Sequence, residues 1–159
     1  MPTVVIFGAS GDLTSRKLIP ALYELARKKR LPPNTRIVGS ARSKFTHEQF
    51  RAALAETTAK FSGKEFDKAV WDAFVPNIYY HSGDIGQAND YQELKKLLDE
   101  IEGAPPHTRI YYLSTSPALY ETAIAFLGSS GLADEAGGSR RIVIEKPFGT
   151  DLPSAQHLN

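Results

Sequence analysis

The chain has 159 residues, 42% of them hydrophobic, and its 19 basic residues nearly balance 18 acidic ones. This length suits one compact domain, and the even charge argues against nucleic acid or an anionic membrane as a partner. Cysteine is absent, which excludes disulfides, thiolate metal sites and cysteine nucleophiles. No apolar run approaches the roughly 20 residues of a membrane helix, so we expect an unprocessed, cytoplasmic protein.

Short runs of β-branched and aromatic residues recur along the chain, as is typical of parallel strands covered on both faces. They predict strands at residues 3–7, 35–39, 78–81, 109–113 and 141–144. Helical patterns alternate with them, at residues 18–30, 46–54, 62–71, 94–101 and 117–127. This alternation predicts an α/β fold: a doubly wound, Rossmann-like parallel sheet with helices on both faces and right-handed crossovers.

Three features mark how the predicted helices begin. Pro20 is expected at a first turn or a bend of the first helix. Thr46 and Gln49 have the spacing of a capping box, and residues 62–65 are expected to cap the helix that carries Trp71. A last helix is expected to begin near Asp151.

The segment GASGDL lies between the first predicted strand and the first predicted helix, which is where a dinucleotide-binding turn belongs. Gly8 and Gly11 permit a tight turn, and the helix N-terminus offers free N–H groups to a pyrophosphate. The spacing is closer to G-x-x-G-x-x-G, with Thr14 in the third place, than to G-x-G-x-x-G. Asp12 is expected in the first helical turn, where a carboxylate can cap N–H groups without touching a phosphate. An ordinary strand-to-helix turn is the alternative.

The end of the second predicted strand indicates which coenzyme to expect. Folds that bind NAD usually place an acidic residue there, to bind the ribose 2′-hydroxyl. This chain has Arg42 there instead, between Ser40 and Ser43. Because a guanidinium binds phosphate through paired, charge-assisted hydrogen bonds, we predict NADP as the coenzyme.

Four segments together resemble one enzyme family. GASGDLTSRKLIPALYEL, VGSARS, YYLSTSP and IVIEKPFGTDL occur in the order seen in the amino-terminal coenzyme-binding domain of glucose-6-phosphate dehydrogenases, and the resemblance covers essentially the whole chain. It implies a coenzyme phosphate loop made of Gly8, Ala9, Ser10, Gly11, Asp12, Leu13, Thr14 and Ser15.

The same resemblance assigns roles to residues outside that loop. It implies that Arg42 recognises the 2′-phosphate, that Asp84 and Ile85 line the adenosine side, that Tyr112 lies near the coenzyme, and that Lys146 contacts both the nicotinamide side and the sugar phosphate substrate. It also makes the Lys146–Pro147 bond a candidate for cis geometry. Lys146 follows the fifth predicted strand, at the edge where open parallel sheets bind ligands, so it could bridge coenzyme and sugar hydroxyls.

The activity implied by the resemblance is oxidation of glucose 6-phosphate by NADP to 6-phosphogluconolactone, the entry to the oxidative pentose phosphate pathway. That step needs a general base, and the family's histidine-bearing substrate motif is absent from this sequence. His157 precedes the expected position, so no catalytic base is assigned, and the chain alone is expected to be inactive. A smaller departure is Ser116 before Pro117, where the family usually has proline or a small residue plus proline.

The expected organisation is an NADP-binding domain over residues 1–150, followed by residues 151–159 as the start of a helix leading into a substrate domain that this sequence lacks. The full-length enzyme is expected to be a homo-oligomer. The scattered histidines predict no metal site and are expected at the surface or in loops: His47, His81, His107 and His157.

Two other functions remain open at this point. A short-chain dehydrogenase or epimerase would use a Tyr-x-x-x-Lys pair, a form that Tyr91 and Lys95 have. Their place before the fourth predicted strand counts against it, and we expect both on a helix surface. A non-catalytic NADP-binding module would share every coenzyme residue named above.

Overall fold

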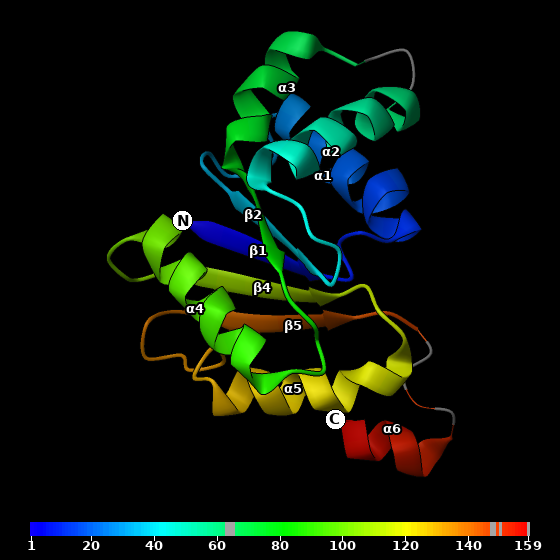
Figure 1. The fold of residues 1–159 in the computed structure, drawn as a ribbon, viewed down its shortest axis with the longest axis vertical. Coiled ribbons are helices and arrows are strands. Elements are labelled where there is room, and N and C mark those ends of the chain that lie inside the picture. Colours follow the sequence, from blue (N-terminus) through cyan, green and yellow to red (C-terminus); the bar gives the residue numbers. More distant parts are fainter. Residues whose placement is uncertain (63–65, 147–148, 150, 159) are drawn as a thin grey trace.

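The computed structural model describes residues 1–62, 66–146, 149 and 151–158, without the side chains of residues 157 and 158. Its strands are β1 (Pro2–Phe7), β2 (Arg36–Ala41), β3 (Ile78–Ser82), β4 (Thr108–Leu113) and β5 (Arg140–Ile144). They form one parallel sheet in the order β3-β2-β1-β4-β5 (Figure 1), so the winding reverses between β1 and β4. The doubly wound parallel sheet is therefore confirmed, and each strand begins and ends within two residues of its predicted range.

Helices cover both faces of this sheet (Figure 1). One face carries α1 (Ile19–Arg27), α2 (His47–Phe61) and α3 (Lys68–Phe74), and the other carries α4 (Ala88–Glu102) and α5 (Tyr120–Ser129). The shorter segments are η1 (Thr14–Leu18), η3 (Val75–Asn77), η4 (Pro117–Leu119) and α6 (Leu152–Leu158). Within the described ranges, no helix combines the length and the apolar character needed to cross a membrane.

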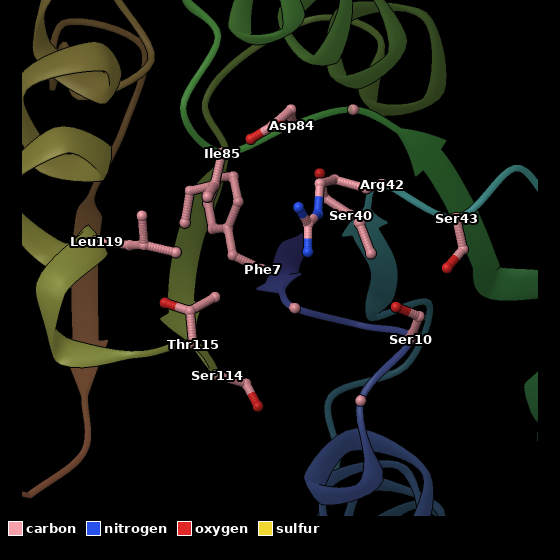
Figure 2. Close-up of a pocket in the computed structure, with 14 residues that line it drawn as sticks. Phe7, Ser10, Ser40, Arg42, Ser43, Asp84, Ile85, Ser114, Thr115 and Leu119 are labelled. Carbon is pink, nitrogen blue, oxygen red and sulfur yellow. The ribbon is translucent and has the colours of Figure 1, made fainter.

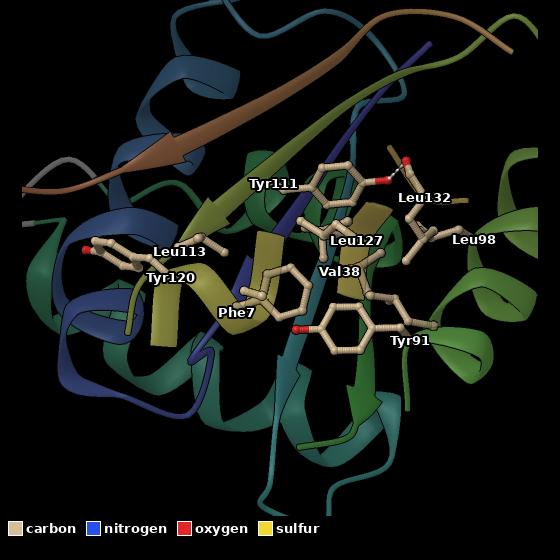
Figure 3. Packing of buried hydrophobic residues seen from close by; sticks show 12 residues of the cluster. Phe7, Val38, Tyr91, Leu98, Tyr111, Leu113, Tyr120, Leu127 and Leu132 are labelled. Carbon is tan, nitrogen blue, oxygen red and sulfur yellow. Dashed lines mark hydrogen bonds between the residues drawn. The ribbon is translucent and has the colours of Figure 1, made fainter. Parts of the chain in front are cut away.

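Alternate residues of the central strand β1 supply the two cores, because successive side chains of a strand point to opposite faces. Phe7 packs with Tyr91 and Leu127 beneath α4 and α5 (Figure 3), while Ile6 packs with Tyr23 beneath α1 and α3. Burying one such side chain contributes about 1.5–3 kcal/mol. The two cores therefore hold the strand ends, and the turns that follow them, in fixed positions.

Pro20 lies in the first turn of α1, as predicted. It comes directly after η1, which is a π-helical turn. Proline has no N–H to donate and its ring clashes with the carbonyl four residues earlier in a regular α-helix. The wider π-turn before Pro20 relieves that clash, and such turns are frequent beside functional sites.

The helix starts were predicted correctly at Thr46 and wrongly at residues 62–65. At the start of α2, Gln49 N donates to Thr46 Oγ1 over 3.2 Å and Thr46 N donates to Gln49 Oε1 over 2.9 Å, which confirms the capping box. The cap of α3 is Asp67, whose carboxylate accepts from Ala69 N at 2.8 Å. Ser62 instead ends α2, and residues 63–65 lie outside the described residues.

Candidate functional site

A cavity of about 770 Å³ opens beyond the carboxyl ends of β1 to β4, at the point where the winding of the sheet reverses (Figure 2). Open α/β sheets bind ligands at this place, and the volume lies within the range of roughly 300–1,000 Å³ usual for small-molecule and cofactor sites. Several of the predicted site residues line it: Gly8, Ser10, Gly11, Arg42, Asp84 and Ile85.

The glycine turn after β1 is pressed against two neighbouring strands. Gly8 has φ of 79°, and a Cβ at this position would collide with the carbonyl oxygen of Ser114 at the end of β4. On the β2 side, Gly8 N and Ala9 N both donate to Ser40 O, at 2.9 and 3.2 Å. Because only glycine tolerates this conformation in this space, Gly8 fixes the close approach of backbone on which a phosphate-binding turn depends.

The other predicted residues of the phosphate loop stand outside the lining of the cavity. Asp12 lies in the first helical turn, as predicted, and its exposed carboxylate pairs with Arg16 at 3.2 Å. The remaining ones shape the turn from behind: Ala9 and Thr14 are buried, Leu13 is half-buried, and Ser15 Oγ donates to Asp12 O over 3.2 Å. In this turn, the residues that line the cavity are therefore Gly8, Ser10 and Gly11.

Arg42 follows the last residue of β2 and is the cationic side chain among the residues that line the cavity. Figure 2 shows it on one side of the cavity with Ser10 and Ser43, while Ile85 and Leu119 lie on the opposite side. The site thus places a cation and hydroxyl groups on one side and apolar side chains, with the hydroxyl groups of Ser114 and Thr115, on the other. Asp84 adds a carboxylate to the lining. A polyanion with a flat aromatic group could satisfy both walls.

The segment after β3 forms a further wall and is fixed by α4. Tyr91 Oη donates to Ile85 O over 2.8 Å, and the ring of Tyr91 stacks on Phe7 with ring centroids 5.7 Å apart. The expectation that Tyr91 lies on a helix surface is therefore wrong, since it is only 2% exposed. It continues the apolar stripe of α4, and Lys95 pairs with Asp99 at 3.0 Å. The two residues do not act as a Tyr–Lys pair.

His81 also departs from expectation, because it is buried in β3 and not placed at the surface or in a loop. Its Nδ1 lies 3.1 Å from Ser40 Oγ, and its ring packs beneath Gly83. Burial lowers the pKa of His81, although Asp90 and Glu93 oppose this shift. His81 therefore packs behind Ser40 and Gly83, two residues that line the cavity, as a neutral imidazole at pH 7.

Two of the other histidines, His107 and His47, have described side chains, and the side chain of His157 lies outside the described residues. His107 is a loop residue as predicted, although it is buried, and its Nε2 lies 3.1 Å from Gly103 O. His47 is half-buried at the start of α2 and accepts a hydrogen bond from the backbone of β3. Over the part of the chain that the structure describes, no three potential metal-ligating side chains come together.

Tyr112 and Lys146 are placed outside the lining of the cavity, at the ends of β4 and β5. Tyr112 Oη donates to Glu145 Oε1 over 2.7 Å. Burial, together with Glu145, raises the pKa of Tyr112 to about 12. Lys146 is exposed next to Glu145, and the Lys146–Pro147 bond falls outside the described residues because it includes residue 147.

The residues that follow β4 were not predicted as site residues, although the segment YYLSTSP contributed to the family resemblance. Ser114, Thr115 and Leu119 form the wall across the reversal of the winding, and Ser114 N donates to Phe7 O over 3.0 Å. Phe7, Ala41 and Gly83 also line the cavity without having been predicted. Phe7 and Ala41 end their strands, and Gly83 directly follows β3. Because open parallel sheets bind ligands beyond the carboxyl ends of their strands, this position could have predicted all three as site residues.

Comparisons with known proteins agree with this geometry. The family model described as "Glucose-6-phosphate dehydrogenase, NAD binding domain" matches residues 5–159. The chain is similar to the glucose-6-phosphate 1-dehydrogenases of Chlamydia muridarum, at 40% identity, and Treponema pallidum, at 41%. Each match covers 98% of this chain, but only 32% and 31% of the relative. The chain thus spans about a third of the length of these relatives.

Solved structures give the same result. A glucose-6-phosphate 1-dehydrogenase from Mycobacterium avium superimposes with a TM-score of 0.84 at 33% identity, covering 99% of this chain and 32% of the other. A glucose-6-phosphate dehydrogenase in complex with its substrate glucose-6-phosphate gives 0.85 at 37% identity, with the same coverage. The chain belongs to the glucose-6-phosphate dehydrogenase family and corresponds to that family's nicotinamide-dinucleotide-binding domain.

Proposed function

We propose that the cavity binds NADP, with the adenosine 2′-phosphate at Arg42. The observation that carries this proposal is the cation at the end of β2, where NAD-binding folds usually present a carboxylate to the ribose. Ser10 and Ser43 lie on the same side of the cavity and add hydroxyl donors for phosphate oxygens (Figure 2). Arg42 is exposed, so its guanidinium is free to form a bidentate pair with a phosphate.

The remaining walls suit the rest of a dinucleotide. The backbone N–H groups of the turn at Gly8 and Gly11 face the pyrophosphate, and the apolar side chain of Ile85 with Asp84 contacts the adenosine. Tyr112 and Lys146 lie towards β4 and β5, on the nicotinamide side of the reversal in winding. A Cβ at Gly8 would collide with the backbone of Ser114, so only glycine lets this turn keep the conformation in which its N–H groups face a pyrophosphate.

We further propose that the complete protein oxidises glucose 6-phosphate at C1 to the lactone. Bound NADP supplies the hydride acceptor for this reaction. Lys146 holds the sugar phosphate at the carboxyl edge of the sheet by charge-assisted hydrogen bonds, which orients C1 towards the coenzyme. A general base must take the hydroxyl proton, and we assign none within these 159 residues. The chain alone should therefore bind coenzyme without turnover.

The wider organisation stays a proposal as well. Residues 1–150 form the NADP-binding domain, and residues 151–159 lead into a substrate domain of a cytoplasmic homo-oligomer that needs neither nucleic acid nor membrane. The edge strand β5 supports the proposal of a further domain packed beside it, because Ile142 and Val143 are 40% and 37% exposed. Exposed apolar residues on an edge strand are usually covered by another element.

The experiment compares NADP and NAD binding by isothermal titration calorimetry in the unmodified chain and in Arg42→Ala. Losing charge-assisted hydrogen bonds worth about 1.5–3 kcal/mol should weaken NADP binding about 10- to 150-fold and leave NAD binding unchanged. Lys44→Ala is the matched control, since Lys44 is an exposed cation two residues away that does not line the cavity. Equal affinities for NADP and NAD in the unmodified chain would refute the assignment of Arg42.

A further inference from the structure

The backbone that carries Arg42 is held by two hydroxyl groups of the neighbouring strand β3. Tyr80 Oη donates to Ser43 O over 2.6 Å and lies 3.2 Å from Ala41 O. Ser82 Oγ donates to the same Ser43 carbonyl over 3.2 Å. The residues on both sides of Arg42 are thus tied to β3: Ala41 is the last residue of β2, and Ser43 lies beyond its end.

Two ring contacts and one backbone hydrogen bond hold Tyr80 in place and so fix the position of its hydroxyl. Tyr80 is only 4% exposed. Its ring packs against Phe50 with centroids 4.6 Å apart and meets Phe45 edge to face at 5.4 Å. Its backbone N donates to His47 Nδ1 over 2.9 Å. Burial also raises the pKa of Tyr80, so the phenol keeps its proton and remains a donor at neutral pH.

We propose that Tyr80 is a positioning residue for coenzyme selectivity, which acts by holding residues 41–43 so that Arg42 is presented to the 2′-phosphate. This inference rests on the proposed binding of NADP at Arg42. Tyr80 does not line the cavity, so it acts through the backbone and not by touching the ligand. An exposed arginine loses conformational entropy when it binds phosphate, and a backbone already held in place reduces that cost.

The test is Tyr80→Phe, which removes the hydroxyl and keeps the ring that packs against Phe50. Losing one net hydrogen bond of about 0.5–1.5 kcal/mol should weaken NADP binding about 3- to 10-fold. NAD binding should not change, since NAD lacks the 2′-phosphate that Arg42 is proposed to bind. The matched control is Tyr79→Phe: Tyr79 is the preceding residue of β3, and its ring contacts His47 and Arg51 instead. This control should leave both affinities unchanged.

A double-mutant cycle shows whether Tyr80 acts through Arg42. In the Arg42→Ala background, Tyr80→Phe should have no further effect on NADP binding, because the side chain that it positions is gone. A further loss of the same size, or an equal loss for NADP and NAD in the Arg42-containing chain, would show a general structural role and overturn the inference. If thermal unfolding shows that Tyr80→Phe folds poorly, Ser82→Ala provides the test, because Ser82 is exposed and also donates to Ser43 O. This variant should weaken NADP binding by a smaller factor than Tyr80→Phe and leave NAD binding unchanged.

The same titrations separate this inference from the proposed function. If Arg42→Ala leaves NADP binding unchanged, the proposal for Arg42 fails. If Arg42→Ala weakens NADP binding while Tyr80→Phe and Ser82→Ala do not, the proposal for Arg42 holds and only the positioning role is refuted.

Discussion

Replacing Gly8 by alanine would place a methyl group where the turn after β1 has no room. A side chain at φ of 79° costs about 1–2 kcal/mol in backbone strain alone. The new Cβ would also collide with Ser114 O and come within 3.1 Å of Thr115 Cγ2. Since Ser114 O is a backbone atom at the end of β4, it cannot turn away, and such overpacking typically adds about 1–3 kcal/mol. The free energy of unfolding should fall by about 2–5 kcal/mol.

Urea unfolding followed by circular dichroism measures this loss against a second glycine. Gly128 lies in α5, and a Cβ built there meets no atom within 4 Å. Alanine is favoured over glycine inside a helix by about 0.5–1 kcal/mol, so Gly128→Ala should stabilise the chain. Opposite signs for the two variants are therefore expected. A loss below about 1 kcal/mol for Gly8→Ala would show that the turn has another conformation and would refute the reasoning.

Three further substitutions test interactions that hold the site's scaffold. Glu102→Ala should cost about 3–5 kcal/mol in urea unfolding, because Glu102 is buried 2.6 Å from the guanidinium of Arg109, which would lose its buried partner. Thr46→Ala should cost about 1 kcal/mol in the same assay by removing the capping box of α2. For His81→Asn, stability should depend less on pH below about 6.5, as measured by unfolding at several pH values. The folded pKa of His81 is lowered, so the unfolded chain binds the proton more readily and stability falls with decreasing pH, by up to about 1.4 kcal/mol per unit.

Each of these outcomes has a control. Asp99 contacts the same guanidinium of Arg109 at 3.2 Å but is 53% exposed, so Asp99→Ala should cost at most about 1 kcal/mol. Similar losses for Glu102→Ala and Asp99→Ala would contradict a buried ion pair. Thr46→Ser keeps the capping oxygen and should restore stability. A pH dependence that survives unchanged in His81→Asn would assign it to other groups.

The sequence predicted those parts of the fold that depend on local pattern. Strand positions followed from apolar runs, the capping box followed from Thr46 and Gln49, and Arg42 was found by its place after β2. In each case the residues concerned are close together in the sequence. Because ligands bind beyond the carboxyl ends of parallel strands, the predicted ends of the strands also predicted where in the fold the site would lie.

The failures involve contacts between residues far apart in the sequence. His81 was expected at the surface or in a loop because the scattered histidines showed no metal-site spacing, but it is buried in β3 with its Nδ1 3.1 Å from Ser40 Oγ of the adjacent strand. Tyr91 was expected on a helix surface, although its spacing from Leu94 and Leu98 matches the buried stripe of α4. There the signal was present: the catalytic pair was rejected because of its position, but the apolar stripe was predicted only over residues 94–101 and was not extended back to Tyr91.

These long-range contacts meet on β2, which joins the two halves of the proposed coenzyme site. Ser40 O accepts from the glycine turn that faces the pyrophosphate, while Ser40 Oγ contacts His81 of β3. On either side of Arg42, Tyr80 of β3 donates to Ser43 O and lies 3.2 Å from Ala41 O. Strand β3 contributes no side chain to the lining of the cavity, yet Tyr80 and Ser82 of this strand hold the backbone that carries Arg42, the residue proposed to select NADP. Substitution of Tyr80 in β3 should therefore alter the choice between NADP and NAD without changing any residue that lines the cavity.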